Sequence, residues 1–308
     1  MRFGVTISCV LAVAVAARGA GTVTITLDPG ATHQTMSGWE CTTFVAEPCT
    51  PHYDAVRDAV LDRAVNDVGI NRVRLEIRSG VENAIDHYRN WIDHGCPAPP
   101  DERYLEWRHN RYATVDDNAD PGVIDWSGFH FTELDEAVER VVLPMRARLA
   151  ARGERLFVNL CYVAFTGQIE GGSYHHDDAD EYGEFVLATY LHMQDAHGFV
   201  PDTWEVVLEP DNVQQWNGTR LGEAIAAAAA RLEAAGFAPR FAAPSNTSMS
   251  QIIAYFDDMV AVPGAARHLE MFSYHRYGAN DATLALIVER AIERDLETGM
   301  LERCCTRT

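Results

Sequence analysis

The sequence predicts an α/β fold, a (β/α)8 TIM barrel, and three observations carry this prediction. Short apolar runs alternate with amphipathic helical patterns along most of the chain, and such alternation is typical of a parallel sheet. About seven to eight such units in 308 residues fit a barrel better than an open, doubly wound sheet. No G-x-G-x-x-G sequence follows an apolar run, so the main signal of a dinucleotide-binding sheet is missing.

The predicted strands are short apolar runs bounded by turn residues or by helical patterns. They are expected at residues 37–45, 70–77, 156–165, 204–208, 237–243, 269–274 and 299–302. The predicted helices carry apolar residues at helical spacing, and they are expected at residues 53–68, 132–151, 180–196, 219–235, 252–260 and 284–296. Pro144 should kink the second of these helices, and Gly236 should end the Ala-rich fourth helix.

The connection after the second predicted strand is unusually long. An insertion at about residues 79–129 carries aromatic side chains at Tyr88, Trp91, Tyr104, Trp107, Tyr112 and Trp126. A long insertion after a strand emerges at the C-terminal face of a barrel, where active sites are built. Two interpretations stay open: the rings form platforms for sugar rings, or they form a small core beneath the loop.

The first 20 residues have the pattern of a secretory signal peptide. An apolar stretch at residues 3–17 follows Arg2, and cleavage is expected near Ala20. The stretch is too short to span a membrane, so residues 21–308 should form a secreted, extracellular or periplasmic barrel with no membrane span. The alternative is a buried first strand. Secretion permits disulfides, and Cys41 and Cys49 are candidates to pair, with Cys96 as a competitor.

Charge and composition argue against several classes of binding partner and of catalytic chemistry. The net charge of −20 disfavours nucleic acid, because nucleic-acid affinity depends on Lys and Arg side chains that neutralise phosphates. The sequence contains no lysine, which excludes P-loop and Schiff-base chemistry. The adjacent residues 175–178 (HHDD) cannot easily converge on one ion, and they are interpreted as a solvated loop. We therefore expect no cofactor and no metal, and a carbohydrate substrate as partner.

Two carboxylates that follow apolar runs are the candidate catalytic pair. Glu209 comes directly after the run at residues 204–208, and Glu302 ends the run at residues 299–302, about three βα units later. In a barrel both side chains reach the mouth, and two carboxylates that flank one bond are the machinery of glycoside hydrolysis. An apolar wall around Glu209 should raise its pKa by desolvation, which suits a general acid.

Several short segments resemble clan A glycoside hydrolases, in particular family 30 and related retaining β-glycosidases. The matching segments are residues 34–40 (QTMSGWE, which includes Trp39 and Glu40), 72–76 (RVRLE), Glu209-Pro210, 273–277 (SYHRY) and 300–302 (MLE). The resemblance implies a retaining double displacement, with Glu209 as acid/base and Glu302 as nucleophile. It also implies that Arg74 keeps the nucleophile ionised, that His275 or Tyr277 orients it, and that Trp39 and Glu40 are supporting or substrate-binding residues.

The chain departs from the family in two respects. The family usually has Asn before the acid/base to bond the sugar 2-hydroxyl, whereas this chain has Leu208. Either another group, such as Asn159 or Asn212, takes that role, or substrate recognition differs. The sequence also stops shortly after Glu302, so we expect an eighth strand and any side domain to be missing, as in a truncated enzyme.

The predicted function is a secreted retaining glycoside hydrolase that cleaves a polysaccharide or an oligosaccharide. Two alternatives stay open. One is a catalytically inactive barrel that binds carbohydrate through the aromatic insertion. The other is a metal-dependent hydrolase that uses the His-rich loop at residues 175–178.

Overall fold

The computed structural model describes residues 24–31, 35–43, 49, 52–116, 118, 120–278 and 281–303. The chain divides into two compact units, residues 1–37 and 38–308. The described residues of the first unit form neither helix nor strand, and the Asp28 carboxylate closes a turn there by accepting the Gly30 N–H at 2.9 Å. The predicted signal peptide at residues 1–20 lies outside the described residues.

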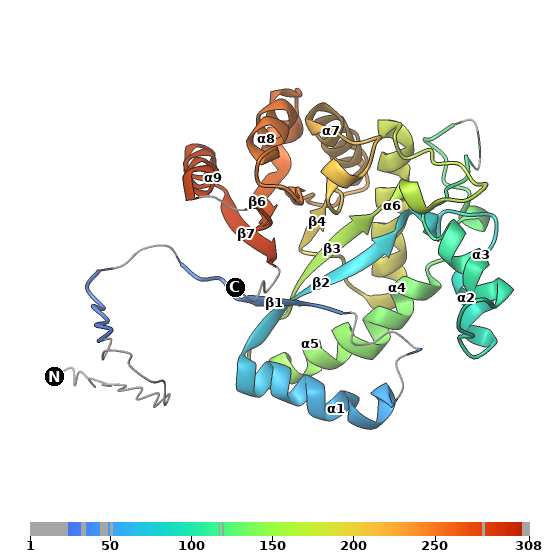
Figure 1. Ribbon diagram of the computed structural model, residues 1–308, viewed down its shortest axis with the longest axis horizontal. Coiled ribbons are helices and arrows are strands. Elements are labelled where there is room, and N and C mark those ends of the chain that lie inside the picture. Colours follow the sequence, from blue (N-terminus) through green and yellow to red (C-terminus); the bar gives the residue numbers. More distant parts are fainter. Residues whose placement is uncertain are drawn as a thin grey trace. The chain divides into compact units, whose positions relative to one another are not determined.

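The second unit is built on one parallel sheet whose described strands follow one another in chain order (Figure 1). The strands are β1 (Trp39–Thr42), β2 (Ile70–Arg78), β3 (Phe157–Val163), β4 (Thr203–Glu205), β5 (Phe241–Pro244), β6 (Leu269–His275) and β7 (Glu297–Glu302). Each strand pairs in parallel with the next. The predicted incomplete (β/α)8 barrel is confirmed by this order.

Helices connect successive strands and lie outside the sheet (Figure 1). They are α1 (Tyr53–Arg63), α2 (His87–Asp93), α3 (Glu102–Asn110), α4 (Thr132–Ala137), α5 (Leu143–Ala150), α6 (Ala179–His197), α7 (Gly218–Ala234), α8 (Ile252–Ala261) and α9 (Asp281–Glu293). A π-helical turn joins α4 to α5 directly before Pro144, which lacks the N–H of a regular turn. No helix within the described residues is long and apolar enough to cross a membrane.

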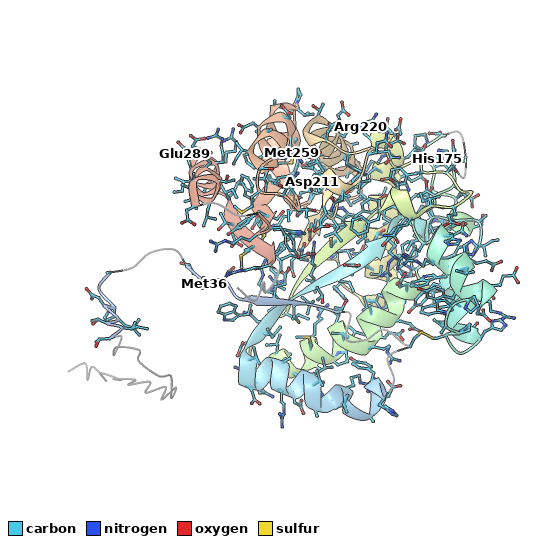
Figure 2. The ribbon with its side chains drawn as sticks, in the orientation of Figure 1. Met36, His175, Asp211, Arg220, Met259 and Glu289 are labelled. Atoms are coloured by element: carbon cyan, nitrogen blue, oxygen red, sulfur yellow. A yellow bond between two sulfur atoms is a disulfide. The ribbon has the colours of Figure 1, made fainter. Side chains whose placement is uncertain are left out.

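Strand β2 shows how the sheet separates apolar from charged side chains. Successive side chains of a strand point to opposite faces, so Val73, Leu75 and Ile77 share one face while Arg74 and Glu76 share the other. The three apolar residues are buried in the main hydrophobic core, and Figure 2 shows side chains filling the space between sheet and helices. The charged face of β2 lines the inside of the curled sheet, where Arg74 reaches side chains of β4 and β7.

The aromatic insertion forms a small core of its own. Tyr88 and Trp91 of α2 and Trp107 of α3 are buried together, and the indole rings of Trp91 and Trp107 stack with centroids 4.3 Å apart. Tyr104 packs against them, whereas Trp126 keeps half of its surface exposed. For this cluster, therefore, the small-core interpretation holds.

The cysteine pairing differs from the favoured expectation. Cys49 forms a disulfide with Cys96, and Cys41 is free. Cys41 lies in β1, where hydrogen bonds to β2 fix its position, while Cys96 follows α2 and its Cα lies 5.7 Å from that of Cys49. The bridge ties the segment before α1 to the aromatic core, because Cys49 and Cys96 both pack against that cluster.

Cys96→Ser should lower the free energy of unfolding by about 2–4 kcal/mol, because the bridge closes a long loop and limits the entropy of the unfolded chain. Urea unfolding under oxidising conditions measures this loss. Cys41→Ser is the matched control and should change stability far less, since Cys41 is free. Equal stability of Cys96→Ser and the parent chain would contradict the pairing.

Candidate active site

Glu209 and Glu302 meet inside the curled sheet, as their positions in the sequence predicted. One oxygen of each carboxylate and one nitrogen of His275 all lie within 4.8 Å of one another. Glu302 is the last residue of β7 and is paired with His275 at the end of β6. Both carboxylates keep access to solvent, with 15% of the Glu209 side chain and 29% of the Glu302 side chain exposed.

An unusual backbone conformation sets the direction in which the Glu209 side chain points. Strand β4 ends at Glu205, three residues earlier than expected, and beyond it the Val206 and Leu208 N–H groups donate to the carbonyls of Ala242 and Tyr162 on either side. Glu209 then takes a left-handed conformation (φ 51°, ψ 60°) before Pro210. Such a conformation costs a non-glycine residue about 1–2 kcal/mol and is typical of functional sites.

The short turn that follows Glu209 holds this residue in place through the side chains of Asp211 and Asn212. The Asp211 carboxylate, labelled in Figure 2, accepts the backbone N–H groups of Thr247 and Ser248 at 2.8 and 2.9 Å. Asn212 donates to Glu209 Oε2 at 3.0 Å and to the Thr247 hydroxyl at 2.7 Å. Asn212, one of the predicted supporting residues, is therefore in direct contact with the candidate acid/base.

Arg74 holds Glu302 by a partly buried ion pair. Its Nη1 donates to Glu302 Oε1 at 2.5 Å, and the hydroxyl of Tyr277 donates to Glu302 Oε2 at 3.2 Å. The other two nitrogens of the guanidinium donate to Glu205, with Nε 2.8 Å from Oε2 and Nη2 2.6 Å from Oε1. Arg74 is 1% exposed and Glu205 is fully buried. The predicted contact between Arg74 and the nucleophile candidate is present.

His275 lies between the two candidate catalytic carboxylates. Its Nδ1 is 3.0 Å from Glu209 Oε1 and 3.6 Å from Glu302 Oε2, and its side chain is fully buried. Tyr277 and His275 were alternatives for orienting Glu302 in the sequence interpretation. In the structure Tyr277 bonds Glu302 and His275 sits closer to Glu209.

The pKa of Glu209 is shifted in the opposite direction from the sequence-based expectation. Burial raises the pKa of this carboxyl, but the hydrogen bond and charge of His275, with hydrogen bonds from Asn212 and Thr247, outweigh it and lower the pKa below its ordinary value. The expectation was wrong because it considered only the apolar run before Glu209 and not the polar groups that fold around the carboxylate.

Two predicted supporting residues lie on β1: Glu40 points into the barrel interior, and Trp39 lies away from the site. Trp39 pairs with Ile70, the first residue of β2, so it lies at the N-terminal edge of the sheet, away from the carboxylates at the C-terminal ends. Its indole is 63% exposed, and the structure does not bring it to the site. Glu40 forms an ion pair with Arg72 at 3.4 Å, one layer below Arg74 in the barrel interior.

Asn159 is buried in the barrel interior, where it holds Glu205 in place. Its side chain is 1% exposed, donates to Glu205 Oε2 at 3.1 Å and accepts the Thr203 hydroxyl at 3.0 Å. Its amide thus bonds buried neighbours, and of the two residues expected to replace the missing Asn, Asn212 is the one that contacts Glu209.

Sequence reasoning missed Glu205. In the segment 204–209 (WEVVLE) this charged residue interrupts an apolar run, and that interruption was the available signal for a buried functional carboxylate. Burial raises the pKa of Glu205, but the charge and hydrogen bonds of Arg74 outweigh it, so the pKa lies below its ordinary value.

The loop at residues 175–178 is not simply solvated, contrary to expectation. His176 is 1% exposed, with Nε2 2.7 Å from Glu82 Oε2 and Nδ1 2.8 Å from the Tyr162 hydroxyl. Tyr162 and Glu82 supply polar partners that let the imidazole be buried. These contacts fasten the loop to β3 and to the start of the insertion.

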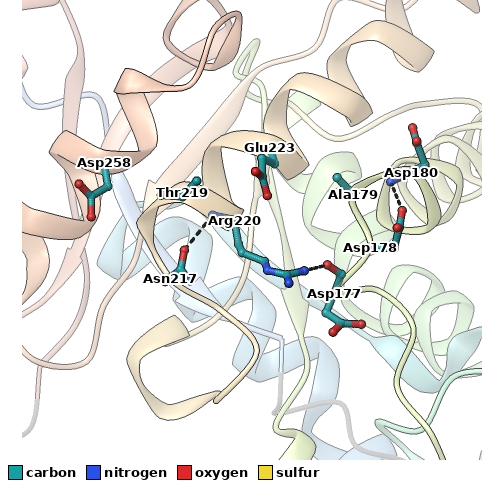
Figure 3. Close-up of a pocket in the computed structure, with 9 residues that line it drawn as sticks. All are labelled: Asp177, Asp178, Ala179, Asp180, Asn217, Thr219, Arg220, Glu223 and Asp258. Atoms are coloured by element: carbon teal, nitrogen blue, oxygen red, sulfur yellow. Dashed lines mark hydrogen bonds between the residues drawn. The ribbon is translucent and has the colours of Figure 1, made fainter.

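A hollow of about 660 Å³ lies beside this loop and is distinct from the Glu209–Glu302 pair (Figure 3). Its lining is mostly acidic, and Arg220 donates across it to the backbone carbonyl of Asp177. The lining residues are Asp177, Asp178, Ala179, Asp180, Asn217, Thr219, Arg220, Glu223 and Asp258. None of them contributes to the catalytic candidates.

Comparison with solved structures identifies the class of fold. An endo-β1,6-glucanase is similar over 92% of this chain and 60% of its own, with a TM-score of 0.58 and 17% identity. A GH30 endoxylanase from Clostridium papyrosolvens C71 is similar over 89% of this chain and 58% of its own (TM-score 0.53, 17% identity). A conserved exported protein from Bacteroides fragilis covers 91% of this chain and 63% of its own (TM-score 0.52, 11% identity).

The fold is therefore that of the clan A glycoside hydrolases. Within that clan it is like that of family 30, as the short sequence segments indicated. This chain spans about three fifths of the length of these solved structures. No protein-family model matches the sequence, and no curated protein does.

Glu205→Gln should lower the free energy of unfolding at pH 7 by about 3 kcal/mol, the low end for breaking a buried ion pair, because Arg74 keeps Glu302 as a partner. The pKa of Glu205 is lowered on folding, so its stabilisation is present above the unfolded pKa near 4.5 and is lost as the pH falls through the folded pKa. Urea unfolding at several pH values should show the difference between the two proteins shrinking towards low pH.

The matched control for this substitution is Glu270→Gln. Glu270 pairs with Arg240 at 3.1 Å on the surface, where an ion pair contributes about 0–1 kcal/mol. A stability loss as small for Glu205→Gln as for Glu270→Gln would contradict the role given to the buried pair.

Proposed function

We propose that this protein is an exported retaining glycoside hydrolase, with Glu302 as nucleophile and Glu209 as acid/base. The observation that carries the proposal is the approach of the two carboxylates, whose nearest oxygens lie within 4.8 Å. Retaining enzymes hold their carboxyl groups about 5–5.5 Å apart, whereas inverting enzymes need about 6.5–9.5 Å to admit a water molecule. The pairing inside a clan A fold supports the same reaction class.

The environments of the two carboxylates support this division of roles. Glu302 accepts charge-assisted and neutral hydrogen bonds from the Arg74 cation and the Tyr277 hydroxyl, which fix the orientation of its carboxylate for attack. Glu209 contacts His275 and Asn212, and neither places a fixed cation as close to it as Arg74 lies to Glu302. Glu209, which Arg74 does not bond, is the carboxylate to which we assign the proton transfer.

In the first step a Glu302 oxygen attacks the anomeric carbon and the glycosidic C–O bond breaks, while Glu209 gives its proton to the departing oxygen. In the second step a water molecule loses a proton to Glu209 and its oxygen attacks the same carbon, which releases Glu302 as a carboxylate. Each step inverts the configuration once, so the product keeps that of the substrate.

We propose a neutral polysaccharide or oligosaccharide as the substrate. The net charge of −20 supports a neutral ligand over an anionic one. Two of the similar structures are named for action on β1,6-glucan or xylan, both built from sugar units, which supports the same class here. The Cys49–Cys96 disulfide and the apolar stretch at residues 3–17 support export to an oxidising compartment.

Glu209→Ala should lower kcat/KM on a natural glycan by about 10²–10⁴-fold, the usual contribution of general acid catalysis. The loss should be smaller on an aryl glycoside with a good leaving group, and azide should restore turnover by taking the place of the activated water. Glu302→Ala should abolish activity on both substrates. Reducing-sugar release and aryl-group release are the two measurements.

Glu297→Ala is the matched control, because Glu297 is an exposed carboxylate at the other end of β7 and should leave both rates unchanged. Equal loss by Glu209→Ala on both substrates, without azide rescue, would contradict the acid/base role. A parent chain that retains glycans on an affinity gel but releases no sugar would support the carbohydrate-binding alternative instead.

His275→Ala should move the alkaline limb of the kcat/KM profile to higher pH. Glu209 must be protonated to act as the acid, so activity falls as pH rises through its pKa, and His275 is the strongest of the groups that lower this pKa. Tyr277→Phe is the control, since Tyr277 bonds Glu302. An alkaline limb that stays in place in His275→Ala would contradict this account of Glu209.

A further inference from the structure

A second cluster of ligand-type side chains lies in the helical layer, away from the carboxylate pair. Asp135 of α4 accepts at one oxygen, Oδ1, from two imidazoles of α6: His192 Nε2 at 2.7 Å and His197 Nε2 at 2.8 Å. Within the described part of the chain, this cluster and the group of Glu209, His275 and Glu302 are the two that gather three such ligand atoms.

The cluster is held in place by its surroundings. The imidazole of His192 stacks on the ring of Phe131, with centroids 4.0 Å apart and planes 9° from parallel. His197 is the last residue of α6, and its ring meets that of His192 edge to face at 5.9 Å. These contacts fix both rings so that both Nε2 atoms point at one place, and such preorganisation is what a metal site requires.

We propose that Asp135, His192 and His197 bind a divalent zinc ion. Two imidazole nitrogens and one carboxylate oxygen are a ligand set that zinc prefers, and water can supply a fourth ligand because the Asp135 and His192 side chains are 32% and 21% exposed. The C-terminal end of α6, where His197 lies, carries the negative end of the helix dipole and favours a cation.

Zinc binding would require the Asp135 oxygen to move away from the two imidazole nitrogens. Zinc–ligand bonds of about 2.0–2.1 Å in a tetrahedron place neighbouring ligand atoms about 3.3 Å apart. The two oxygen–nitrogen distances at Asp135, now 2.7 and 2.8 Å, would therefore lengthen by about half an ångström, and the two nitrogens already lie within 4.8 Å of each other. A bound ion would cross-link α4 to the end of α6, so its role is structural and separate from the proposed hydrolysis.

The test is calorimetric titration of the full chain with zinc chloride after removal of metals with EDTA. The chain carries Glu302→Gln, so that the group of Glu209, His275 and Glu302 does not compete for the ion. We expect one zinc per chain, and a higher melting temperature in its presence, because a ligand that binds the native state stabilises it.

His192→Gln and Asp135→Asn, each in the same background, should weaken zinc binding more than about tenfold, since even outer-sphere changes cost 10–100-fold. His109→Gln is the matched control: His109 faces a single carboxylate, Glu170, at 3.4 Å, and its loss should leave the affinity unchanged. Circular dichroism verifies that each variant is folded.

Two results would overturn the proposal. One is zinc binding weaker than millimolar in the chain with the intact cluster, which needs no further variant to interpret. The other is tight binding that His192→Gln and Asp135→Asn leave unchanged. Either result is independent of the proposed hydrolase function, because the cluster shares no residue with the Glu209–Glu302 pair.

Discussion

The rest of the site depends on the two ion pairs that the buried guanidinium of Arg74 makes with Glu205 and Glu302. An arginine that is 1% exposed would be costly without partners, and Glu205 on β4 and Glu302 on β7 offset the desolvation cost with short hydrogen bonds. Strands β2, β4 and β7 are not neighbours in the sheet, so this one side chain joins three strands across the barrel interior. The planar fork also fixes the direction in which the Glu302 carboxylate points, which a lysine could not do.

The different partners of Glu209 and Glu302 explain why two chemically identical side chains are suited to the different roles proposed for them. Glu302 is tied to a permanent cation, whereas Glu209 contacts a histidine and an amide, neither of which carries a permanent charge. The low pKa of Glu209 in the free protein therefore depends on His275 more than on the apolar wall before it. Burial raises the pKa of this carboxyl, and His275 at the end of β6, with Asn212 and Thr247 in the loops after β4 and β5, outweighs the effect of burial.

Sequence patterns predicted the order of the strands, the helices outside the insertion and the carboxylate pair, because these follow from periodicity. Short segments that resemble one clan implied the contact of Arg74 with Glu302, and they left His275 and Tyr277 as alternatives for a second one. They did not predict the early end of β4, the partner of Cys96 or the burial of His176. Each of those depends on contacts between residues far apart in the chain: Ala242 and Tyr162 for β4, the aromatic core for the disulfide, and Glu82 for His176.

In the proposed hydrolase, the residue before Glu209 departs from the pattern of the family that the sequence resembles. Leu208 is 6% exposed and packs with Tyr112, Cys161 and Val163, so its side chain supplies an apolar wall and no group that bonds a sugar hydroxyl. Polar contacts to a sugar next to the reacting bond must then come from neighbouring loops. The turn that carries Asn212 is the best placed of these, because the Asn212 amide already contacts Glu209 Oε2. A substrate hydroxyl that displaced this contact would remove a hydrogen bond that lowers the Glu209 pKa, and binding would thereby make the carboxyl a weaker acid that is more easily protonated, as the first step requires.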